Sequence, residues 1–119
     1  MSQYSVTLEK GNIEEIAELI DNAVLNGITP EKRASVVKTI NNVNIIFNTY
    51  DRTSWYQKGL ISLSVLITDD GSKISIDAVS SGGRNFFNDY TPAENKFIGI
   101  VKRVVEEYEK TDIYYKSME

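Results

Sequence analysis

Two segments of this sequence combine residue types that could bind a small anion. The first is Ser80-Ser81-Gly82-Gly83-Arg84. Its paired glycines would let backbone N–H groups approach an anion, and its arginine could add a bidentate contact. Glycine loops that hold phosphate usually run straight into a helix, whereas Asn85 to Tyr90 separate this loop from the next predicted helix. We therefore favour a structural turn that leaves a sheet, with an anion site as the alternative.

The second segment, Tyr50 to Gly59, concentrates aromatic rings and cations, a composition that is enriched at contact surfaces. In one interpretation its rings pack across strands or over the end of a sheet. In the other, this segment and the glycine loop together enclose a pocket for an anionic small molecule. The residues of that predicted ligand site are Arg52, Trp55, Lys58, Ser81, Gly82, Gly83 and Arg84.

Carboxylates offer weaker signals for chemistry. Asp69-Asp70 precedes Gly71, a combination that a tight hairpin turn selects without any metal. Asp77 lies in the middle of a predicted strand among serines, where a solvated charge that discourages pairing at a sheet edge is the simpler interpretation. We therefore predict no metal site at these carboxylates.

The chain contains no histidine and no cysteine. This excludes thiolate ligands and nucleophiles, and it removes the imidazole that most zinc sites and hydrolase triads use. Carboxylates, lysine, tyrosine, serine and threonine are left for proton transfer, with Asp77 or a tyrosine as the candidates for an enzyme. The composition therefore weighs against an enzyme. We predict no catalytic residues, no metal ligands and no cofactor.

Composition predicts one folded domain over residues 1–119. Of these residues 41% are hydrophobic and 25% are charged, as in ordinary globular proteins. The net charge of −4 opposes binding to phosphate backbones or anionic lipid. The first residues lack the basic start and apolar core of a signal peptide, and no stretch reaches membrane length. We therefore expect a cytoplasmic protein that binds neither nucleic acid nor membrane.

Two helices are predicted from caps and spacing. Asn12 can cap the first, Glu15 completes a capping box, and Gly27 ends the helix. The second begins at Thr91-Pro92-Ala93-Glu94, where a cap, a helix-starting proline and a capping-box glutamate coincide, and continues through Tyr108. Apolar residues recur at helical spacing in the first helix at Ile13, Ile16, Ala17, Ile20 and Val24, and in the second at Phe97, Ile98, Val101, Val104 and Val105.

Five strands are expected, at Tyr4–Leu8, Ser35–Ile40, Val43–Tyr50, Leu60–Thr68 and Ile74–Ala78. The stretch of residues 30–40 is ambiguous, because Thr29 and Pro30 could start a helical turn before a run of β-branched residues. We favour a strand there, followed by an Asn41-Asn42 hairpin turn. The order β-α-β-β-β-β-α predicts an α+β two-layer sandwich in which two helices cover one face of a curved antiparallel sheet.

The two faces of this sheet should differ. Ile61, Leu63, Val65 and Ile67 alternate with small polar residues, so the face away from the helices is expected to be small and hydrophilic. No predicted element covers that face or the open edge. We therefore predict a non-catalytic interaction module that self-associates as a homodimer, through this polar face or through the edge of the sheet. The anionic-ligand site is the alternative function.

Three stretches resemble a small bacterial family of uncharacterised proteins, a domain of unknown function. They are Ile45–Arg52, Ile76–Gly83 and the closing helix with Val104-Val105-Glu106-Glu107-Tyr108. The order of elements also resembles one repeat of the fold named after the TATA-binding protein. The acidic charge and polar sheet face depart from a DNA-binding saddle, which needs basic residues and apolar wedges. The resemblance therefore implies a fold and no activity.

Overall fold

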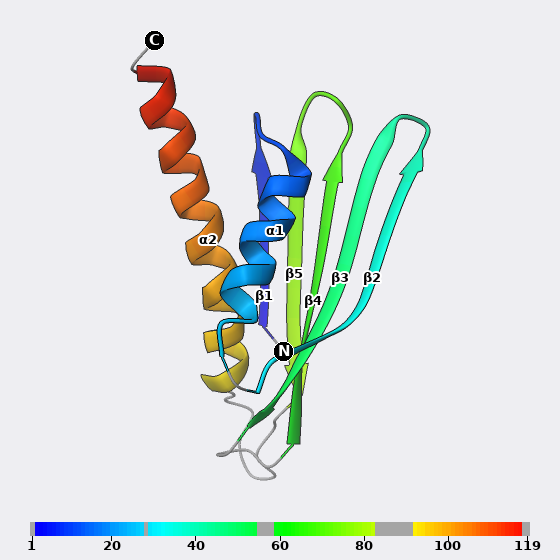
Figure 1. The fold of residues 1–119 in the computed structure, drawn as a ribbon, viewed down its shortest axis with the longest axis vertical. Coiled ribbons are helices and arrows are strands. Elements are labelled where there is room, and N and C mark those ends of the chain that lie inside the picture. Colours follow the sequence, from blue (N-terminus) through cyan, green and yellow to red (C-terminus); the bar gives the residue numbers. More distant parts are fainter. Residues whose placement is uncertain (1, 28, 55–58, 83–91, 118–119) are drawn as a thin grey trace.

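The computed structural model of the protein describes residues 2–27, 29–54, 59–82 and 92–117. Five strands and two helices follow one another in the predicted order (Figure 1). The elements are β1 (Ser2–Leu8), α1 (Ile13–Val24), β2 (Glu31–Ile40), β3 (Val43–Ser54), β4 (Gly59–Asp69), β5 (Ile74–Gly82) and α2 (Pro92–Ser117). The α+β prediction and its element order are confirmed.

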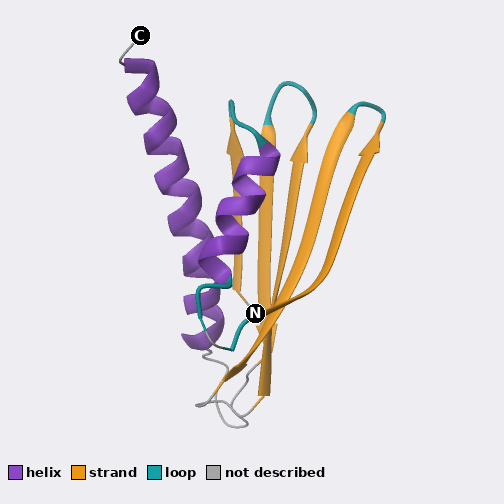
Figure 2. Ribbon diagram, in the orientation of Figure 1, coloured by secondary structure: helices purple, strands orange, loops and turns teal. Residues whose placement is uncertain are grey.

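The strands form one antiparallel sheet in the order β1-β5-β4-β3-β2. Both helices lie on the same side of this sheet (Figure 2). They pack against each other and against β1, β5 and β4. We call the face under the helices the inner face and the opposite face the outer face. The outermost strand, β2, lies beyond the two helices (Figure 1).

The core lies between the helices and the inner face. Residues of β4 and β5 alternate between buried and half-buried, as a sheet with one covered face requires. The predicted inner residues of β4 are all buried, and so is the apolar stripe of α1. The largest fully buried side chains are Tyr50, Phe97, Ile16, Ile20, Ile61, Leu63, Ile67, Ile76, Val24, Val65 and Val101.

Local sequence signals explain where these elements begin and turn. The Asn12 side chain accepts a hydrogen bond of 3.0 Å from the Glu15 N–H, so the predicted cap of α1 is confirmed. Asn41 and Asn42 have φ values of 50° and 67°, which suits the two-residue hairpin turn between β2 and β3. The ambiguous stretch is therefore strand, as favoured, and the strand begins at Glu31.

Some boundaries differ from the sequence prediction. β3 runs through Ser54, so the first residues of the predicted Tyr50–Gly59 connection belong to a strand paired with β4. α1 ends at Val24 with Leu25 as its cap, before Gly27. α2 continues to Ser117 in one helix. Among the described residues no helix is long and apolar enough to span a membrane.

A polar tie connects α1 to β2 and β3. The buried Tyr50 hydroxyl on β3 donates a hydrogen bond to the Asp21 carboxylate on α1. The Lys32 ammonium on β2 lies 2.8 Å from the other oxygen of the same carboxylate. Burial, followed by the hydrogen bond to Asp21 and its charge, raises the pKa of Tyr50 above its ordinary value of 10.0. The tie holds the start of β2 against the helical layer.

Replacing Tyr50 by Phe should cost about 1–2 kcal/mol of unfolding free energy at pH 8, because Asp21 loses a buried donor. In the unfolded chain this hydroxyl ionises from about pH 10, whereas the folded protein keeps it protonated. The stability that it adds is therefore complete below pH 10 and is lost as the pH rises further. Urea unfolding at pH 8 and pH 11 should show the difference between wild type and variant shrinking by roughly 1.4 kcal/mol. A difference that is the same at both pH values would contradict this role.

Candidate functional site

Arg52 is the part of the predicted anion site that is best defined. It lies on β3 and points to the inner face, where its guanidinium carbon is 4.6 Å from the centre of the Phe97 ring of α2. This distance is within the range of a cation–π contact. Partial burial lowers the pKa of Arg52. The Phe97 ring therefore helps to hold the Arg52 side chain in place.

The glycine loop is divided between the two faces of the sheet. Gly82 shares one cross-strand row with Arg52, since each pairs with Ile61 of β4. Ser81 points to the outer face, where its hydroxyl lies 2.9 Å from that of Ser62. Trp55, Lys58, Gly83 and Arg84 are outside the described residues. The structure thus brings Arg52 and Gly82 to one end of the inner face and leaves Ser81 on the other side.

The predicted turn carboxylates are used by the turn itself. The Asp69 side chain accepts from the Gly71 N–H at 2.9 Å, and the Asp70 side chain accepts from the N–H groups of Ser72 and Lys73 at 2.8 Å. These backbone hydrogen bonds lower the pKa of Asp70. Asp77 lies on the outer face and accepts a hydrogen bond of 3.3 Å from Ser75. No cluster of possible metal ligands occurs in the described part of the chain.

An open groove of about 690 Å³ runs between the two helices. Leu19 and Ala23 of α1 and Val104 and Tyr108 of α2 form its apolar lining. The Tyr108 hydroxyl already accepts a hydrogen bond of 3.0 Å from the Asn12 N–H. The groove therefore presents mainly the seam between two packed helices.

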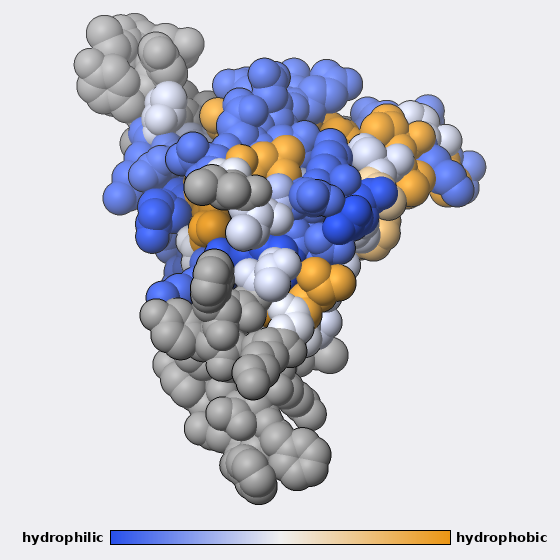
Figure 3. All heavy atoms as spheres, turned by 60° about the horizontal axis from the view of Figure 1, so that its bottom comes forward, coloured by the Kyte–Doolittle hydropathy of each residue, from blue (hydrophilic) through white to orange (hydrophobic). Residues whose placement is uncertain are grey.

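The strand β2 is the most unusual surface of the molecule. All ten of its residues are exposed, including three large apolar ones. Val37 is 73% exposed and Ile40 is 53% exposed. Figure 3 shows hydrophobic surface gathered on the side of the molecule where this strand lies. An interior strand would bury such β-branched residues, so their exposure marks β2 as a surface that lacks a neighbour.

The free edge of β2 exposes a defined set of backbone groups. The two-residue turn makes Ile40 and Val43 a hydrogen-bonded pair. Hydrogen-bonded pairs alternate along an antiparallel ladder, so every second residue back from Ile40 bonds to β3. The residues between them point their N–H and C=O groups away from the sheet. These outward residues are Ser35, Val37 and Thr39.

The outer face carries an apolar ridge that the sequence analysis did not anticipate. Val36, Phe47 and Leu66 stand in one cross-strand row on β2, β3 and β4. Phe47 and Leu66 are half-buried and Val36 is exposed. The prediction of a uniformly small and hydrophilic face is wrong for this part of the sheet, although Ser62, Ser64 and Ser75 do lie on it. The signal in the sequence is Phe47 of β3 and Leu66 of β4, two large apolar residues on the side of the alternation that faces away from the helices.

Comparison with known sequences adds one match. The model of a family described as a family of unknown function (DUF6054) matches residues 1–109. No curated protein matches the chain.

Two glycines with similar backbone angles should respond differently to alanine. Gly82 has φ +95° and an added Cβ would overlap the Leu60 carbonyl oxygen, whereas Gly71 has φ +91° and no atom within 4 Å of that position. We expect Gly71→Ala to lose about 1–2 kcal/mol of unfolding free energy from the backbone angle alone. Gly82→Ala should lose more than about 3 kcal/mol, because the overlap adds to the same angle cost. Chemical denaturation measures both, and equal losses would show that the close approach to Leu60 is unimportant.

Proposed function

The chain belongs to DUF6054, a family of unknown function, and from its open edge strand we propose that it is an interaction module that forms a homodimer through β2. A second β2 adds antiparallel to the first, so that two five-stranded sheets become one sheet of ten. The two copies use the same surface, as a two-fold symmetric dimer requires. No catalytic step enters this function.

The exposed edge supports the proposal. Ser35 and Val37 present backbone donors and acceptors that an added strand would satisfy. The exposed Val37 side chain would gain a cross-strand neighbour in the same step. Strand addition thus removes two costs of the monomer together, namely unpaired backbone groups and exposed apolar area.

The helical layer leaves room for the second copy. α1 and α2 pack against β1, β5 and β4, and β2 extends beyond them (Figure 1). In a two-fold pair of antiparallel strands, the inner faces of both copies lie on the same side of the joined sheet. The two β2 strands, none of whose residues is buried, then lie between the two helical layers. The helices do not obstruct the pairing.

A proline at Val37, one of the residues whose backbone groups point to the free edge, tests this proposal. Val37→Pro removes an N–H that points to the free edge and leaves the hydrogen bonds from β2 to β3 in place. We expect the dissociation constant of the dimer to rise at least about tenfold, because the two-fold axis removes two N–H donors and each lost hydrogen bond costs about 0.7 kcal/mol or more. Light scattering and sedimentation across micromolar concentrations measure the change.

Val37→Ala is the matched control, since it shortens the side chain and keeps the N–H. It should weaken the dimer less than Val37→Pro does. Circular dichroism should show both variants folded. A wild-type protein that stays monomeric at 100 μM, or two variants with equal effects, would overturn pairing through this edge.

We also propose a second candidate function, the binding of a small anion at the end of the sheet near Arg52. The supporting observation is the guanidinium held over Phe97 in the same cross-strand row as Gly82. Partial removal from water strengthens the attraction of such a cation for an anion.

A bacterial origin, a cytoplasmic location and likeness to one repeat of the TATA-binding-protein fold stay predictions.

If this second candidate is right, inorganic phosphate or citrate should raise the melting temperature of the wild-type protein and change its Trp55 fluorescence. Arg52→Gln should abolish both effects, because it removes the charge at the site. Arg33→Gln is the control, since Arg33 lies on β2 and pairs there with Glu31 and Asp51. Equal responses from all three proteins, or none from the wild type, would eliminate this site.

A further inference from the structure

We infer that the second copy pairs with β2 in one register, in which Ser35 faces Ser35 and two Glu31–Lys38 ion pairs join the copies. This inference rests on the proposed homodimer and adds the geometry of its interface. It follows from three properties of β2, which are the set of outward backbone groups, the position of a β-bulge and the distribution of charge.

The backbone groups restrict where the two-fold axis can lie. Two facing residues must both point their backbone groups across the interface, or both point them away from it. Ser35 belongs to the outward set, so two copies of it can exchange both hydrogen bonds. Ala34 then faces Val36 of the second copy, and these residues share the outer face. The centre of the strand is thereby paired without an unmatched group.

The β-bulge keeps residues with the same backbone orientation opposite each other toward the start of β2. The pairing of β2 with β3 shifts between Lys32 and Ala34, which makes Arg33 an extra residue. Beyond it, Lys32 faces Val37 of the second copy. Both of these residues lie on the inner face, because they pair with Tyr50 and Ile46 of β3.

The next pair brings opposite charges together. Glu31 faces Lys38 of the second copy, and both side chains lie on the outer face, since they pair with Asp51 and Ile45. This pair is not hydrogen-bonded through its backbones, the arrangement in which facing side chains come closest. The two-fold axis repeats the contact, so the dimer gains two such pairs.

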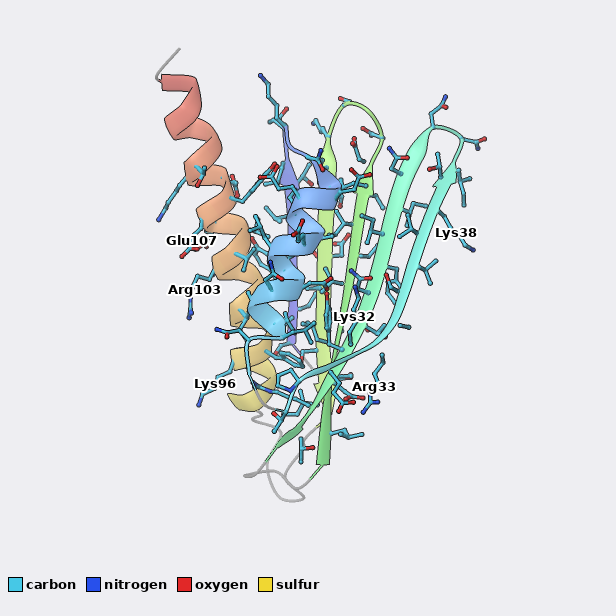
Figure 4. The ribbon with its side chains drawn as sticks, viewed as in Figure 1. Lys32, Arg33, Lys38, Lys96, Arg103 and Glu107 are labelled. Atoms are coloured by element: carbon cyan, nitrogen blue, oxygen red, sulfur yellow. The ribbon has the colours of Figure 1, made fainter. Side chains whose placement is uncertain are left out.

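Neighbouring registers lose this complementarity. If the two-fold axis lay at Ala34, Glu31 would face Val36 of the second copy. If the axis lay at Val36, Glu31 would face Ile40. A centre at Lys38 would bring two ammonium groups together. Among the described residues Lys38 has no ion-pair partner within its own chain. Figure 4 shows it extending away from the sheet at the end of β2, whereas Lys32 is held by Asp21.

The same register joins the apolar ridges of the two copies. Val36 lies diagonally across the two-fold axis from Val36 of the second copy, because each faces Ala34 of the other. The row of Val36, Phe47 and Leu66 therefore continues into its symmetry mate. One apolar strip then crosses six strands of the outer face.

Charge exchange tests the register. Glu31→Lys and Lys38→Glu should each raise the dissociation constant of the dimer by about tenfold to thirtyfold, because each places two like-charged pairs in the interface. An equimolar mixture of the two variants should form a heterodimer of near wild-type affinity, since both of its ion pairs are restored. Glu14→Lys on α1 is the matched charge control and should leave the affinity unchanged. Native mass spectrometry of the mixture reports the heterodimer directly.

Crosslinking gives a second measurement that does not depend on charge. The chain has no cysteine, so Ser35→Cys introduces a single thiol. Two facing residues of a hydrogen-bonded pair lie about 5.5 Å apart, within the range of a disulfide. Mild oxidation should crosslink Ser35→Cys and leave Thr39→Cys monomeric under denaturing conditions.

The outcomes separate the register from the proposed function. A wild-type protein that does not dimerise would overturn both. If Val37→Pro disrupts the dimer, but the charge variants change neither its affinity nor the formation of heterodimers, only the register is overturned. Preferential crosslinking through Thr39→Cys would overturn it as well, while leaving edge pairing intact.

Discussion

The helical layer is narrower than the sheet, and this difference in width shapes the rest of the molecule. α1 and α2 bury the inner side chains of β5 and β4 and cover those of β1, of which Leu8 is buried. The burial continues into β3 through Ile46 and Tyr50. No residue of β2 is buried. The fold thus consists of a packed part whose core reaches into β3 and an open edge formed by β2. An isolated hairpin is marginally stable in water, so β2 and β3 depend on their attachment to β4 and on the polar tie to α1.

That tie shows how charge can support an exposed strand. The Asp21 carboxylate accepts a hydrogen bond from the Tyr50 hydroxyl and lies 2.8 Å from the Lys32 ammonium. One carboxylate on α1 therefore contacts both β3 and β2. Exposed ion pairs contribute little alone, but here a buried phenol anchors the carboxylate first. On the other side of the strand, Arg33 contacts Glu31 and Asp51. The charges of β2 therefore position the strand within its own chain and leave its outward backbone groups open.

The sequence predicted the elements that are set by local rules. The Asn12 cap, the Asn41-Asn42 turn and the alternation of β4 each follow from a few neighbouring residues, and the structure confirms them. It did not predict that β2 would be an uncovered edge, because strand order depends on contacts far apart in the chain. The apolar ridge was missed for a related reason, since Phe47 and Leu66 become neighbours only when β3 pairs with β4. The anion site was predicted from the composition of two segments alone. In the structure Ser81 lies on the outer face of the sheet and Arg52 on the inner face.

The features that protect an edge strand are also the features that would make its pairing selective. Long apolar edges aggregate, and proteins limit this with cations and bulges. β2 has both, in Lys32, Arg33, Lys38 and the shift beside Ala34. A flat, uncharged strand would accept many partners in many registers. A strand with one bulge, an acid at one end and a lysine at the other would accept its own copy best in a single alignment, because every shift would separate the charges or move the extra residue out of step. The proposed recognition would therefore depend on the shape and the charge of one exposed strand.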